Sequence, residues 1–180
     1  MIPALWVAVT GQASGVGPGD SLVMLGKEHA CGGMLLPIPP FRNDGWLPVG
    51  HHAASWEELG VRFGGAVGTR RMFLTNKLLE LRDTLRLLGV TGYLLLNGSS
   101  ISTKPEPEDF DVLLVGPLDI QAMKDVNPRL ERLLDAEMAE NVGGYSLFYL
   151  PSDSPALELL STFWDLSKEG VAKGIIKVEL

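Results

Sequence analysis

The chain has 180 residues, 46% hydrophobic and 21% charged, which is enough for one domain with a buried core. Its formal net charge of −7 argues against broad binding to DNA or RNA, because that needs a basic face. The single cysteine, Cys31, excludes an intrachain disulfide and a zinc site built on cysteines. No apolar run approaches the about 20 residues that cross a membrane, so we expect no membrane contact and a cytoplasmic protein.

The first 33 residues differ in composition from the rest of the chain. Residues 11–19 are rich in glycine and low in charge, so we expect residues 1–33 to be a poorly ordered or extended N-terminal segment. Residues 7–17 resemble the strand and glycine turn of short-chain dehydrogenases, but Pro18 stands where the helix should begin. We therefore expect the folded domain to comprise residues 34–180.

Two helices are predicted early in this domain. Ser55 and Glu58 form a capping box, which predicts a short helix that ends near Gly64 and Gly65. Before it, His51 and His52 follow a proline and are expected in a loop. The second predicted helix begins after Thr69 and ends near Leu88, and its apolar residues recur at intervals of three and four, at positions 74, 78, 81, 85 and 88.

The remaining elements alternate between strands and helices. In chain order we expect a strand over 92–97, a strand over 109–115, a helical region over 120–140 broken at Asn127–Pro128, a strand over 144–150, a helix over 155–164 and a terminal strand over 174–180. This order predicts an α/β (α+β) fold, a mixed β-sheet flanked by helices.

The turn between the strands over 92–97 and 109–115 carries the most informative motif. Gly98 and Ser99 follow the first strand, and Asp109 and Asp111 open the second. Side chains two positions apart in a strand project from one side of the sheet. Two like charges that close are unfavourable without a cation between them. A divalent metal that holds the phosphates of a nucleotide is the predicted cation.

Further residues of the loop fit the same chemistry. A glycine allows a phosphate to approach backbone N–H groups, a serine hydroxyl can donate to it, and Lys104 adds a positive charge. The competing interpretation is a β-hairpin with a polar loop and two surface aspartates. His51 and His52 as metal ligands or bases, and Ser99 or Ser100 as a hydrolase nucleophile, are weaker alternatives. Neither serine has a Gly-x-Ser-x-Gly elbow or a histidine after it.

The set Gly98-Ser99…Asp109-x-Asp111 resembles the signature of the nucleotidyltransferase superfamily that includes DNA polymerase beta. Residues 34–180 resemble, more narrowly, an uncharacterised prokaryotic family with a nucleotidyltransferase-like fold. The further blocks that carry this resemblance are Ile38-Pro39-Pro40-Phe41, Asp44-Gly45, Ser55-Trp56-Glu57-Glu58-Leu59, Arg70-Arg71, Phe163-Trp164-Asp165 and the segment from Lys173 to Leu180.

The resemblance implies a site for a nucleoside triphosphate and a metal. Asp109 and Asp111 would be the catalytic residues and would bind Mg²⁺ or Mn²⁺. The nucleotide-binding residues would be Gly98, Ser99, Ser100 and Lys104. Active members add a third carboxylate from a later strand, where this chain has Ser146, and Glu179 could replace it only if it faces the same cleft.

Two functions follow as expectations. The first is a Mg²⁺-dependent enzyme that transfers a nucleoside monophosphate from NTP to a hydroxyl, with a helical toxin as its protein partner if the chain is an antitoxin. The alternative is a catalytically degenerate module that binds a nucleotide or a partner protein.

Overall fold

The computed structural model describes residues 38–117, 119–134, 144–167 and 170–180. All of them belong to the unit Gly33–Leu180. The predictions for residues 1–33, for Cys31 and for the glycine turn at 7–17 lie outside the described residues. None of the described helices is long and apolar enough to cross a membrane.

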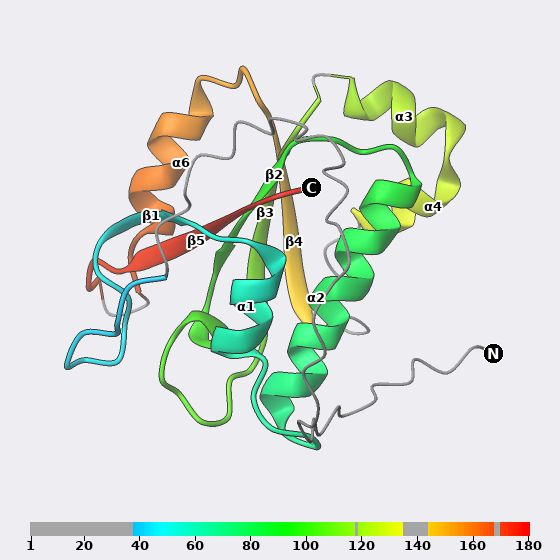
Figure 1. Cartoon of the computed structure of the whole chain (residues 1–180). Helices are drawn as coiled ribbons and strands as arrows, with labels where there is room; N and C mark the ends of the chain where they lie inside the picture. Colours follow the sequence, from blue (N-terminus) through cyan, green and yellow to red (C-terminus); the bar gives the residue numbers. More distant parts are fainter. Residues whose placement is uncertain (1–37, 118, 135–143, 168–169) are drawn as a thin grey trace, which may run out of the picture. The chain divides into compact units, whose positions relative to one another are not determined.

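Five strands form one mixed sheet in the order β1-β5-β2-β3-β4 (Figure 1). Their bounds are β1 (Gly50–Ala53), β2 (Tyr93–Asn97), β3 (Phe110–Gly116), β4 (Tyr145–Pro151) and β5 (Gly174–Glu179). The central strand β2 is antiparallel to both of its neighbours, β3 and β5, whereas β1 and β5 are parallel, as are β3 and β4. The predicted mixed sheet flanked by helices is confirmed.

The described α-helices begin at or within one residue of their predicted starts, whereas the 3₁₀ turn η1 was not predicted. Their bounds are α1 (Trp56–Phe63), α2 (Arg70–Leu87), the 3₁₀ turn η1 (Ser99–Ile101), α3 (Ile120–Val126), α4 (Pro128–Leu133) and α6 (Ala156–Trp164). The capping box of α1 is present, because Ser55 Oγ accepts a hydrogen bond from the Glu58 N–H at 3.1 Å and the Glu58 carboxylate accepts one from the Ser55 N–H at 2.9 Å. The predicted break at Asn127–Pro128 separates α3 from α4.

The sheet buries a different set of side chains on each face. One face packs against α1, α2, α3 and α4, and its core includes Leu94 and Leu96 of β2 with Leu78 of α2. The other face packs against α6 through a smaller cluster that includes Leu95 of β2 and Leu113 of β3. Successive residues of β2 therefore point to opposite helical layers, as strand geometry requires. Figure 1 shows α2 and α6 on the two sides of the strands.

The expectation of a loop at His51 and His52 is wrong. Residues 50–53 form the edge strand β1, in which His51 is the register partner of Ile175 in β5. The four residues show little apolar character of their own. They are extended because β5 supplies a template for parallel pairing, a tertiary effect that local sequence does not encode.

The buried stripe of α2 makes a first prediction about stability. Leu78 is 0% exposed, whereas Val61 on α1 is 84% exposed. Leu78→Ala should lower the free energy of unfolding by about 2–5 kcal/mol because it leaves a cavity in the core, and Val61→Ala should change it by less than about 0.5 kcal/mol. Urea unfolding followed by circular dichroism measures both, and equal effects of the two substitutions would contradict the packing described.

Candidate functional site

A cavity of about 550 Å³ lies at the turn between β2 and β3. Five of the six predicted site residues line it, and these are Gly98, Ser99, Lys104, Asp109 and Asp111. The first four belong to the segment that we call the motif loop, residues 98–109, and Asp111 lies at the start of β3. Figure 1 draws this loop in green below β2 and β3. Pockets that bind small molecules have volumes of about 300–1,000 Å³, and this cavity lies within that range.

The register between β2 and β3 brings the two halves of the motif together. Asn97 is directly opposite Asp111, and Leu96 is opposite Val112. Gly98 follows with φ +89°, a backbone conformation that favours glycine. A Cβ atom at this position would lie 3.0 Å from Asp111 Oδ2 and 3.2 Å from the Asp111 nitrogen. Glycine therefore allows the Asp111 carboxylate to lie against the backbone of the turn.

The two serines of the motif have different surroundings. Ser99 lines the cavity, and its Oγ accepts a hydrogen bond from the Glu108 N–H at 3.1 Å, which leaves the hydroxyl able to donate. Ser100 is only 1% exposed and its Oγ donates to the carbonyl oxygen of Asp109. The structure thus brings Ser99 to the cavity wall and places Ser100 beneath the loop, where it fixes the position of Asp109.

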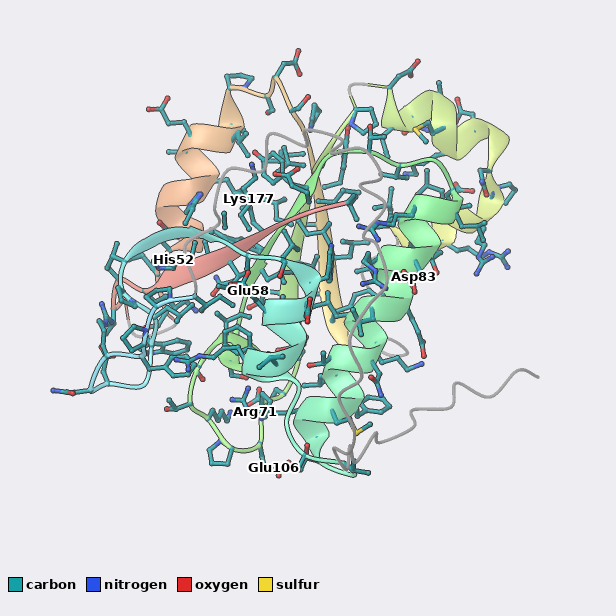
Figure 2. All side chains as sticks on the ribbon, in the orientation of Figure 1. His52, Glu58, Arg71, Asp83, Glu106 and Lys177 are labelled. Atoms are coloured by element: carbon teal, nitrogen blue, oxygen red, sulfur yellow. The ribbon has the colours of Figure 1, made fainter. Side chains whose placement is uncertain are left out.

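Arg71 on α2 forms three hydrogen bonds with the backbone of the motif loop. Its guanidinium donates to the carbonyl oxygens of Ser100 at 3.0 Å, Ser102 at 2.6 Å and Lys104. Burial lowers the pKa of Arg71 from its ordinary value, and the nearby Glu106 carboxylate opposes that shift; an arginine stays charged even so. Figure 2 shows Arg71 and Glu106 close together at this loop. Sequence reasoning named Arg71 only as part of the block Arg70-Arg71 that resembles the prokaryotic family.

Two lysines reach the cavity from different elements. The predicted one, Lys104, is largely exposed and forms an ion pair with Glu108 at 2.6 Å. The other, Lys173, is 5% exposed, and its Nζ lies 4.5 Å from the centre of the Trp46 ring. Sequence reasoning missed Lys173 as a site residue, because it precedes the last strand and is far from the motif in the chain. Its only signal was its place in one of the blocks that resemble the prokaryotic family.

The charges that line the cavity do not balance. The lining includes four carboxylates and two lysines, a formal excess of two negative charges. The carboxylates belong to Asp44, Glu108, Asp109 and Asp111. A triphosphate alone would be repelled by such walls, whereas a divalent cation would be attracted. Carboxylate oxygens are also the ligands that Mg²⁺ prefers, so the donor chemistry of Asp109 and Asp111 fits a magnesium ion.

The third carboxylate does not come from Glu179. Glu179 is opposite Tyr93, at the end of β2 remote from Asn97, and it pairs with Lys177 at 2.9 Å. Ser146 is the β4 partner of Asp111, as its spacing predicts. Within the described segments, no group of three or more histidine, cysteine, aspartate or glutamate side chains is arranged to hold a metal ion.

The two histidines of β1 do not line the cavity at the β2–β3 turn. His51 Nε2 lies 3.4 Å from Asp165 Oδ1, and His51 lines a second cavity of about 480 Å³ with Tyr93 and Lys177. His52 Nε2 lies 2.7 Å from the carbonyl oxygen of Pro48. The structure therefore does not bring either histidine together with the motif residues.

The fold and the cavity define an α+β protein with a polar, negatively charged site at one turn of a mixed sheet. Residues 39–179 match the model of a family described as "Family of unknown function (DUF6932)". The chain belongs to this family, and the matched range contains every residue that lines the cavity. No curated protein and no solved structure matches the chain.

The contacts of Arg71 predict a local effect of its removal. Arg71→Met should increase amide hydrogen exchange in residues 98–108 by about 10-fold or more, because three charge-assisted hydrogen bonds to the loop are lost. Arg86→Met, in the last turn of the same helix, should leave exchange in the loop unchanged. Hydrogen exchange followed by mass spectrometry gives both values, and equal exchange in the two variants would refute the role of Arg71.

Proposed function

We propose that this chain is a magnesium-dependent nucleotidyltransferase that binds a nucleoside triphosphate in the cavity at the β2–β3 turn. The observation that carries the proposal is the convergence of Gly98, Ser99, Asp109 and Asp111 on one cavity, through the pairing of β2 with β3. A hairpin with two surface aspartates, the competing interpretation, does not require a cavity between the two halves of the motif.

Each residue has a role that its position supports. Asp109 and Asp111 would hold Mg²⁺ or Mn²⁺, and the bound ion would neutralise charge on the triphosphate. The backbone at Gly98 and the hydroxyl of Ser99 would contact phosphate oxygens. The buried Lys173 is better suited than Lys104 to a phosphate contact, because a buried cation is less screened by water and salt.

The proposed reaction is transfer of a nucleoside monophosphate to a hydroxyl. The oxygen of the acceptor forms a bond to the α-phosphorus, the bond from that phosphorus to pyrophosphate breaks, and the proton of the hydroxyl leaves to water. The residues named above would position the triphosphate for this attack, which is the main contribution that a protein makes to phosphoryl chemistry.

A second candidate is a module that binds the nucleotide without transfer. The position of Glu179 at the far end of β2 favours it, because that residue cannot act as the base for an acceptor at the cavity. A helical toxin as partner and a cytoplasmic location remain predictions that rest on the resemblance and the composition.

Nucleotide binding has a direct test in the full chain. Mg²⁺ with at least one of ATP, GTP, CTP and UTP should raise the melting temperature, and EDTA should abolish the effect. Asp109→Asn and Asp111→Asn should each weaken binding by about 10-fold or more, whereas Asp83→Asn, at an exposed position of α2 outside the cavity, should not. Stabilisation that persists in both cavity variants would contradict the proposed site.

Transfer is measured in the same samples with each triphosphate radiolabelled at its α-phosphate. Label on a hydroxyl acceptor that is lost in Asp109→Asn and Asp111→Asn supports the enzyme. Nucleotide-dependent stabilisation with no transfer to protein, RNA or small-molecule hydroxyls supports the binding module instead.

The two lysines should differ in their effect on affinity. Lys173→Met should weaken binding of the magnesium–triphosphate complex by about 10–100-fold, because a charge-assisted hydrogen bond is lost in a buried setting. Lys104→Met should weaken it by less than about 3-fold, because that ammonium is exposed and paired with Glu108. Isothermal titration calorimetry gives both dissociation constants, and the reverse order would show that Lys104 is the main phosphate contact.

A further inference from the structure

Asn97 is a polar residue of the cavity that the proposed function leaves unexplained. It is the last residue of β2, lies opposite Asp111, lines the cavity and is 6% exposed. Asparagine is rarely buried to this degree unless its polar atoms are satisfied. The burial of its amide group therefore needs a physical explanation.

The orientation of the Asn97 amide is fixed by one contact. Its Nδ2 donates to the carbonyl oxygen of Trp164, at the end of α6, at 2.6 Å. The opposite orientation would set two acceptor oxygens against each other, so the hydrogen-bond pattern assigns the nitrogen to α6 and leaves Oδ1 as the other polar atom.

Asn97 Oδ1 has no hydrogen-bond partner and almost no contact with solvent. A buried acceptor without a partner costs about 1–3 kcal/mol, so native proteins seldom keep one without a use for it. The oxygen belongs to the residue opposite one of the two proposed metal-binding aspartates. A cation would satisfy it.

We propose that Asn97 Oδ1 joins Asp109 and Asp111 as the third oxygen ligand of a single divalent cation. The proposal rests on the proposed function only in assigning the two aspartates to a metal, and it requires no nucleotide. Amide and carboxylate oxygens are used together in magnesium and calcium sites. Two carboxylates and one neutral amide would give the ion three oxygen ligands from the protein.

This assignment has a chemical consequence for the site. An amide cannot take a proton from an acceptor hydroxyl, so Asn97 contributes to binding of the cation and does not replace a carboxylate base.

The alternative is that Asn97 only ties β2 to α6 through its Nδ2. Two substitutions separate the roles. Asn97→Ala removes both the tie and the oxygen, whereas Asn97→Asp removes the donor to Trp164 and keeps an oxygen, now charged. If the tie alone matters, both variants lose stability and both leave binding of the ion unchanged or weaken it alike. If the oxygen is a ligand, Asn97→Ala weakens the affinity for the ion and Asn97→Asp does not.

The experiment is a titration of the full chain with Mn²⁺, without nucleotide, followed by electron paramagnetic resonance. The parent chain should bind one Mn²⁺, Asn97→Ala should bind it about 10-fold more weakly, and Asn97→Asp should bind it at least as tightly. The exposed Asn76→Ala on α2 is the control. Circular dichroism confirms that each variant is folded at the temperature of the titration.

Each outcome decides the matter. One Mn²⁺ that is lost in Asp109→Asn but bound equally by the parent, Asn97→Ala and Asn97→Asp refutes the ligand role and leaves the proposed function standing. Equal weakening in both Asn97 variants assigns the residue to the tie with α6. A parent chain that binds two ions contradicts the single-ion site, and one that binds none overturns both this inference and the metal-dependent function.

Discussion

The antiparallel pairing of β2 with β3 is the constraint on which the candidate site depends. It sets Asn97 opposite Asp111, so that the backbone of Gly98 and the second carboxylate meet at one turn. A shift of this pairing by one residue would turn each side chain of β3 to the other face of the sheet. Leu113 and Val112 are buried in different helical layers, and this burial on both faces holds the register.

The loop that the pairing creates is held on more than one side. Arg71 donates to its carbonyl oxygens from α2, and the Thr103 N–H donates to the carbonyl oxygen of Gly45 at 3.0 Å. A loop held in this way fixes Asp109 at the wall of the cavity that Asp111 also lines. Under the proposed function, the negative lining of the cavity would make binding of an anionic nucleotide depend on a bound cation.

Local sequence predicted the elements whose signals are local. The capping box at Ser55, the apolar spacing of α2 and the break at Pro128 each depend on neighbours within about four residues, and the structure contains all three. The motif predicted that Gly98, Ser99, Asp109 and Asp111 meet, because two adjacent strands joined by a loop form a hairpin. Strand β1 was missed because its pairing partner β5 is distant in sequence. Asn97 was missed as a site residue because its hydrogen bond to the Trp164 carbonyl oxygen depends on the distant helix α6. Lys173 was missed because it is far from the motif in the chain and reaches the cavity only in the folded protein. The different positions of Ser99 and Ser100 were also not predicted, because one serine faces the cavity and the other is buried only once the turn has formed.

The central claim is that one divalent cation and a triphosphate occupy the cavity between the motif loop and β3. The most direct measurement is a crystal structure of the full chain with Mn²⁺ and a non-hydrolysable nucleoside triphosphate, with anomalous scattering used to locate the manganese. The account predicts a single manganese peak bound by Asp109 and Asp111, with phosphate density beside Gly98 and Ser99. Manganese elsewhere on the protein, or triphosphate density away from this cavity, would contradict it.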